Sequence, residues 1–126
     1  MKKKMIVPAI AAFFLLGNSL AFAGGTSYAT ISANSTGESG NQVSMKGSVH
    51  VTGEIYLFTN TRLWVENYKA VTGPDTRISG VKLDGTGYGV DTADYYDNVT
   101  SGTYYVHLDP DGPYEKGAEG WGKLQN

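Results

Sequence analysis

The 126-residue chain contains no cysteine. It can form no disulfide, it has no thiol for redox chemistry, and it lacks the residue to which a bacterial lipoprotein anchor is attached. A domain of this size buries roughly 60–70% of the surface that its unfolded chain exposes. We therefore expect a hydrophobic core alone to hold the fold.

Positive charge is scarce beyond the N-terminal segment. From Gly24 onward, seven Lys and Arg stand against twelve Asp and Glu, a formal net charge of −5. The imbalance is concentrated in residues 84–119, which hold eight carboxylates and one lysine. Because nucleic acids and anionic membranes both attract basic surfaces, we expect no nucleic-acid partner and no electrostatic binding to a membrane.

Long apolar runs are absent except near the N-terminus. Three lysines, at positions 2–4, precede an apolar stretch over residues 5–17, and Ala21-Phe22-Ala23 has the small residues of a signal-peptidase site. The stretch is shorter than the ~20 residues that a membrane-spanning helix needs, and the cleavage motif disfavours an N-terminal anchor. We predict a signal peptide over residues 1–23 and a single domain over residues 24–126. We expect a bacterial-type secreted protein, in the periplasm or outside the cell.

No apolar pattern with the 3.6-residue period of a helix is long enough to form one. The 17 Gly and nine Tyr, with scattered β-branched residues, are typical of short strands and tight turns. Apolar runs predict strands over residues 28–33, 42–52, 54–58, 62–69, 77–83, 86–90 and 102–108, and one near position 121. The first and the last of these are expected to be edge strands. This spacing predicts an all-β fold, a small antiparallel β-sandwich of immunoglobulin-like or jelly-roll-like type with seven to eight short strands.

Glycine, proline and acidic residues predict the connections. A tight reversal is expected at Gly53. Gly47, which interrupts an apolar strand face, marks either a bulge or the close approach of a neighbour. Turns are expected over residues 72–75, at Asp84-Gly85 and over residues 109–112, where Asp-Pro-Asp-Gly fits a type I turn. Residues 91–98 are predicted to form an acidic connection. Asn60 is either the centre of a short hairpin loop, which we favour, or the middle of one long strand.

The hexapeptide Ser101-Gly102-Thr103-Tyr104-Tyr105-Val106 resembles the start of strand F in immunoglobulin-like domains. Val106 stands where those domains commonly have a cysteine. The resemblance implies that Tyr104 is a tyrosine-corner residue, whose hydroxyl bonds to the backbone just upstream. It also implies that Trp64 packs as a buried core tryptophan. The match covers six residues and carries information about the fold only.

Aromatic side chains are more numerous than one small core can hold, so some must lie on the surface. Planar rings with a polar tip suit sugar stacking or a protein interface. We predict a non-enzymatic binding protein that uses an aromatic and acidic surface, with a protein or a cell-surface glycan as its partner. The candidate binding residues are Trp64, Tyr95, Tyr96, Tyr105 and His107. Exposed strand edges also make self-association through edge strands a candidate.

A calcium site and two alternative functions fit the residues less well. Asp109 and Asp111 contain a fragment of a Ca²⁺-binding loop, so calcium is the one cofactor considered; otherwise none is expected. His50 and His107, with a carboxylate or a serine, could form a small metal-assisted or Ser/His-type hydrolase, although Gly-x-Ser-x-Gly and His-Glu-x-x-His are absent. A secreted bacteriocin-like, toxin or inhibitor factor is the remaining alternative.

Overall fold

The structure, a computed structural model, describes residues 24–56, 61–85, 90–111 and 116–126. Seven strands form there: β1 (Thr26–Ile31), β2 (Glu38–Ser39), β3 (Val43–Ile55), β4 (Arg62–Ala70), β5 (Thr76–Asp84), β6 (Asp91–Asp111) and β7 (Gly120–Gln125). The all-β prediction is confirmed. Within these ranges no helix is long and apolar enough to cross a membrane. Residues 1–23 lie outside the described part of the chain, so the signal peptide stays a prediction.

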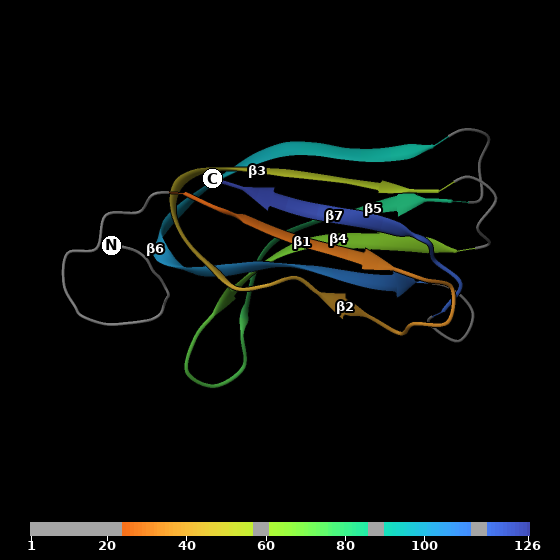
Figure 1. The fold of residues 1–126 in the computed structure, drawn as a ribbon, viewed down its shortest axis with the longest axis horizontal. Coiled ribbons are helices and arrows are strands. Elements are labelled where there is room, and N and C mark those ends of the chain that lie inside the picture. The colour runs from red at the N-terminus through yellow and green to blue at the C-terminus, as the bar shows by residue number, and fades with distance from the viewer. Residues whose placement is uncertain (1–23, 57–60, 86–89, 112–115) are drawn as a thin grey trace, which may run out of the picture.

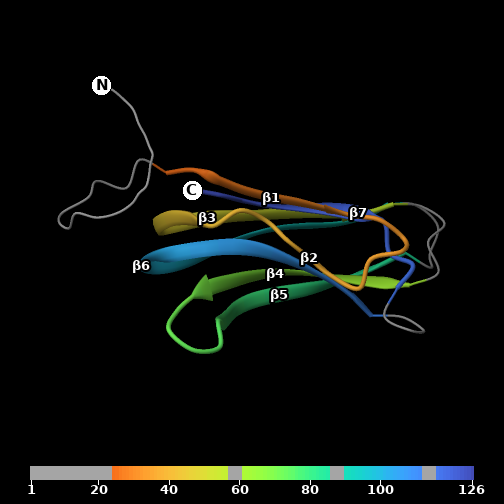
Figure 2. The ribbon, with the colours of Figure 1, turned by 60° about the horizontal axis from the view of Figure 1, so that its bottom comes forward.

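The strands pair antiparallel in the order β1-β7-β3-β6-β4-β5, and β2 pairs with β6. Figures 1 and 2 show that this sheet folds over into two layers. The first layer contains β1, β7, β3 and the N-terminal half of β6. The second contains β2, the C-terminal half of β6, β4 and β5. A β-sandwich-like arrangement results, in which β6 belongs to both layers.

A bulge accounts for the change of layer along β6. Lys46 of β3 lies opposite two residues of β6, Thr100 and Ser101, between the pairs Met45–Gly102 and Gly47–Val99. Gly47 has a positive φ of 84°, which a glycine adopts at little cost. Because a bulge bends and twists its strand, β6 turns here from one layer into the other (Figure 1). Of the two alternatives for Gly47, the bulge is therefore the one observed, and no neighbour lies within 4 Å of a Cβ built there.

The core lies between the layers, and two glycines set how closely the layers approach. Gly53 of β3 and Gly122 of β7 are paired neighbours in the first layer. A Cβ at Gly53 would lie 2.9 Å from Val65 Cγ2, and one at Gly122 would lie 2.7 Å from Leu108 Cδ2. Both contacts are with buried residues of the second layer. The predicted reversal at Gly53 is therefore wrong: β3 continues through it, because the glycine makes room for the opposite layer.

Two other predicted connections are strand. Residues 91–98 pair with β3, and Asp109, Pro110 and Asp111 pair with β4. The Val106 N–H does not donate to β4; it donates to Ser27 Oγ of β1, at 3.0 Å. Since backbone groups alternate sides along a strand, the Pro110 nitrogen faces the same way as that of Val106. The proline therefore removes no hydrogen bond to β4, and the strand continues past it.

One of the two strands predicted to lie at the edge of the sheet is an inner strand. β1 is an edge strand, as predicted, but β7 lies between β1 and β3. The free side of β1 is covered by one side chain: Asn41 accepts from Tyr28 N at 3.2 Å and donates to Thr26 O at 3.0 Å. Asn41 thereby occupies two of the backbone groups that an added strand would use at this end of β1.

The turn over residues 72–75 is confirmed, since it joins β4 to β5. Other expectations concern residues outside the described ranges: the loop around Asn60, most of the strand predicted over 86–90, and Gly112.

Candidate binding surface

The outer side of the second layer carries four aromatic rings on two adjacent strands. Trp64 and Tyr68 of β4 point outward because they alternate with the buried Leu63, Val65 and Asn67. On β6, Tyr105 and His107 likewise alternate with buried residues. These four residues are the outer aromatic face. Three of them, Trp64, Tyr105 and His107, were predicted from the sequence.

The Tyr68 ring contacts two of the other three rings. Tyr68 and Tyr105 are directly paired across β4 and β6, with ring centroids 5.7 Å apart and an interplanar angle of 28°. The His107 ring meets Tyr68 edge-on, with centroids 5.5 Å apart. Such cross-strand aromatic contacts stabilise a sheet and also hold the rings in fixed positions.

Hydrogen bonds to other segments hold two of these rings, Tyr105 and His107, in place. The Tyr105 hydroxyl donates to Asp75 Oδ2 at 2.6 Å, and His107 Nδ1 lies 2.8 Å from Ser39 Oγ of β2. Partial burial, together with the Asp75 carboxylate that accepts this proton, raises the pKa of Tyr105 to about 12. Burial, followed by the Glu66 carboxylate, raises the pKa of Tyr68. Both phenols are therefore neutral donors at physiological pH.

Cations surround Trp64. The Arg77 guanidinium lies 5.0 Å from the Trp64 ring centroid, and Lys82 Nζ lies 5.5 Å from it. Arg77 also donates from Nε to Glu66 Oε2 at 2.7 Å. Gly80 permits this placement, because a Cβ there would run into the Arg77 guanidinium. The surroundings of Trp64 are thus of mixed charge, whereas the sequence suggested an acidic surface.

The remaining predicted binding residues lie elsewhere. Tyr95 points between the layers, where it packs against the core and its hydroxyl lies 2.8 Å from Ser79 Oγ. Burial raises its pKa. Tyr96 lies on the outer side of the first layer, 65% exposed, and stacks on His50 with centroids 4.3 Å apart. Neighbours in sequence on a strand point to opposite sides, so no single surface contains both.

Trp64 does not occupy the position that the immunoglobulin resemblance implies. Its side chain is partly exposed on the outer side of β4 and is absent from the core cluster. Tyr104 does match: it is 1% exposed, and its hydroxyl donates to Thr100 O at 2.6 Å. The resemblance therefore describes the strand around Tyr104 and does not extend to Trp64.

The proposed calcium ligands lie on the outer side of β6. Asp109 and Asp111 are two residues apart on a strand, and Lys82 Nζ lies 3.4 Å from Asp111 Oδ2. No group of three or more metal-ligating side chains occurs among residues that the structure describes. The strand geometry also separates the two carboxylates by about 7 Å along the backbone, instead of wrapping them around one ion.

The two histidines lie in different layers, and each has part of a hydrolytic triad. His107 contacts Ser39, while His50 Nε2 lies 2.6 Å from Asp94 Oδ1. Within the described chain, neither histidine has a serine on one ring nitrogen and a carboxylate on the other. A Ser-His-Asp triad needs all three groups in one chain of hydrogen bonds, so this geometry gives the hydrolase alternative no support.

Sequence reasoning missed one member of the outer aromatic face, Tyr68, and the cation beside Trp64, Arg77. Tyr68 could have been found, because it continues the outward series of Trp64 and Glu66 at a spacing of two. Arg77 offered no such signal, since its position depends on pairing between β4 and β5 and on the space at Gly80.

Comparisons of the chain with protein-family models, with curated proteins and with solved structures gave no match.

Proposed function

We propose that the chain is a secreted, non-enzymatic binding protein, and that the outer aromatic face contacts its partner. The observation that carries this proposal is the set of four partly exposed rings on β4 and β6, two of which, Tyr105 and His107, are held by side chains of two other segments. A surface whose side chains are already ordered loses little side-chain entropy on binding.

The partner that fits best is a protein. Tyr, Trp and Arg are the residues most enriched among those that contribute most to protein interfaces. The face contains two tyrosines and a tryptophan, and Arg77 lies over the Trp64 ring. The cations of Arg77 and Lys82 lie close to the Trp64 ring, which leaves less of that ring for stacking on a sugar. Two ion pairs, Arg77–Glu66 and Lys82–Asp111, lie beside the face, and such mixed charge suits a complementary protein surface better than a neutral glycan.

The experiment is a comparison of variants in which each surface is altered separately. Residues 24–126 are immobilised and exposed to culture medium and cell-envelope extract, and retained proteins are identified by mass spectrometry; a glycan array is probed in parallel. We expect Trp64→Ala and Arg77→Ala to weaken retention of a specific protein by about 2 kcal/mol or more each, or roughly 30-fold.

Tyr96→Ala is the matched control, because it removes an exposed ring from the outer side of the other layer. Circular dichroism establishes that each variant is folded. Retention lost with Tyr96→Ala but kept with Trp64→Ala would place the contact surface on the first layer and contradict the proposal. Selective glycan binding that survives Arg77→Ala would replace the protein partner with a carbohydrate.

A further inference from the structure

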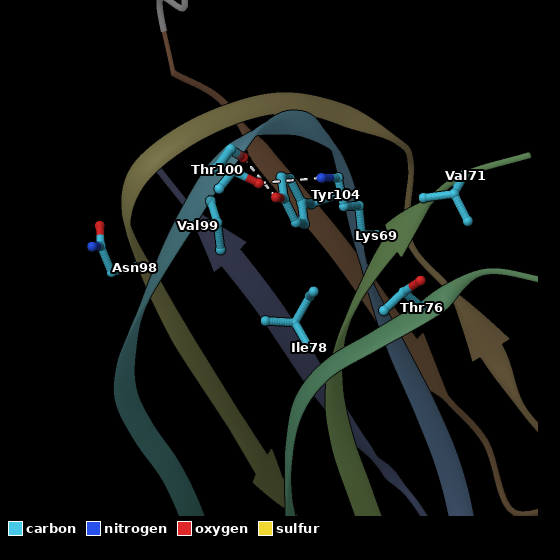
Figure 3. A pocket seen from close by; sticks show the side chains of 8 residues that line it. All are labelled: Lys69, Val71, Thr76, Ile78, Asn98, Val99, Thr100 and Tyr104. Carbon is cyan, nitrogen blue, oxygen red and sulfur yellow. Dashed lines mark hydrogen bonds between the residues drawn. The ribbon is translucent and has the colours of Figure 1, made fainter.

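A cavity opens between the layers at the end of the sandwich where β6 bends. Its volume is about 400 Å³, within the range of small-molecule sites. Figure 3 shows that its walls come from the end of β4, the start of β5 and the bend of β6. Lys69, the lining residue from β4, alternates with Tyr68 and so points to the inner side of that strand, which separates the cavity from the outer aromatic face.

Two irregularities keep this end of the sandwich open. β5 contains an extra residue, Ile78, between the pairs Asn67–Ser79 and Tyr68–Arg77. On the other side, the bulge opposite Lys46 turns β6 away. The layers therefore diverge here, and core side chains do not fill the space between them.

The cavity wall is apolar and partly uncovered. Val71 and Ile78 are 40% and 38% exposed, whereas Val99 and Tyr104 lie deeper and are buried. Figure 3 places Ile78 and Val99 on facing walls. Covering this surface would remove apolar area from water, which is the main favourable contribution to binding an apolar group.

One cation in the cavity lining, Lys69, has no carboxylate as an ion-pair partner among the described residues. Lys69 is the only charged residue among the described residues that line the cavity, and its Nζ donates to Thr100 Oγ1 at 3.2 Å. The same Nζ lies 5.8 Å from the centroid of the Tyr104 ring. In the described part of the chain, no acidic side chain forms an ion pair with Lys69. An uncompensated ammonium beside an apolar wall attracts an anion that has an apolar body.

We propose that this cavity binds a small amphipathic carboxylate. The carboxylate group accepts hydrogen bonds from Lys69 Nζ and the Thr100 hydroxyl, and the apolar body lies against Val71, Ile78 and Val99. The protein as a whole is acidic, so general charge attraction does not favour such a ligand, and its binding depends on this local arrangement.

Octanoate is the probe, and octanol is its neutral counterpart. Binding to residues 24–126 is measured by titration calorimetry, and the site is located by amide and methyl NMR shifts. We expect octanoate to shift signals of Lys69, Val71, Ile78 and Thr100. Octanol should bind roughly tenfold more weakly, because it lacks the charge-assisted contact with Lys69.

Lys69→Met is expected to weaken octanoate binding roughly tenfold and to leave octanol binding unchanged. Lys46→Met is the matched control, since Lys46 is an exposed lysine that does not line the cavity. Ile78→Asp places a negative charge at the exposed wall and should abolish octanoate binding without disturbing the core. The proposal is overturned by an absence of saturable octanoate binding, by shifts that map elsewhere, or by equal affinity of the wild type and Lys69→Met.

Discussion

Tyr104 and Tyr105 are adjacent, yet their hydroxyls stabilise different parts of the fold. Tyr104 points inward and closes the bend of β6 through Thr100 O. Tyr105 points outward and holds the β4–β5 turn through Asp75. Asp75 also accepts from Val71 N, so the turn is attached both to its own strand and to β6. One pair of residues thus fixes a wall of the cavity and one end of the outer aromatic face.

The hydroxyl of Tyr105 should lose its proton only at an unusually high pH. Its pKa is raised to about 12 from an ordinary value of 10.0, so the stability that it contributes is fully present below pH 10 and is lost as the pH rises through about 12. Asp75→Asn should lower this pKa. The measurement is the ¹³Cζ shift of labelled tyrosine followed between pH 10 and 12.

Asp94→Asn serves as the control, because Asp94 contacts His50 in the other layer. The predicted role of Asp75 is contradicted if Tyr105 titrates identically in the wild type and in Asp75→Asn.

Among the elements, β6 shows where sequence reasoning succeeded and where it could not. Residues 102–108 were predicted correctly, because Tyr104, Val106 and Leu108 form a buried alternating series. Residues 91–98 were missed because the inner side of that half is partly polar: Tyr95 and Asp97 bond to Ser79, and Asp97 also accepts from Asn67 at 3.0 Å. An apolar alternation cannot reveal a strand whose inward side chains are satisfied by hydrogen bonds.

The candidate site was predictable to a similar degree. Trp64, Tyr105 and His107 could be found because each is an aromatic residue on an outward strand position. Their grouping with Tyr68 depends on the register between β4 and β6, which local sequence does not determine. For the same reason, the sequence could not show that Tyr96 lies on the other layer.

The bulge between β3 and β6 should depend on the backbone conformation of Gly47. No atom lies within 4 Å of a Cβ built there, and φ is +84°, so Gly47→Ala adds strain without a steric contact. We expect a loss of about 1–2 kcal/mol in the free energy of unfolding. Gly47→Asn should lose less, because asparagine tolerates positive φ. Urea denaturation measures both.

Gly37→Ala is the matched control: a Cβ there makes only ordinary contacts, at 3.5 Å and beyond, and Gly37 has no positive φ. A stability of Gly47→Ala equal to that of Gly37→Ala would show that the bend does not need the glycine.

At the scale of the whole molecule, the layers are joined by β6 and pressed together at the Gly53–Gly122 pair. A Cβ at Gly122 would lie 2.7 Å from Leu108 Cδ2 and 3.0 Å from Val106 Cγ2. Both neighbours are fully buried and cannot move aside freely. The spacing of the layers therefore depends on the two glycines of the first layer as much as on the side chains of the second layer that pack against them.

Gly122→Ala should destabilise the protein by about 1–3 kcal/mol through overpacking. Leu108→Val removes the Cδ2 atom in question, so the double variant should be less destabilised than the sum of the two single variants. The expected coupling is about 1 kcal/mol, measured by a double-mutant cycle in urea. Strict additivity of the two changes would contradict this account of how the layers are spaced.

The position of β7 affects when the protein can fold. It follows every other described strand in the chain, yet it lies between β1, the first of them, and β3. While a ribosome is still adding residue 119, β1 has no sheet neighbour and the first layer has a gap. Contacts between such distant segments close slowly. The first layer therefore cannot be completed until β7 has been synthesised.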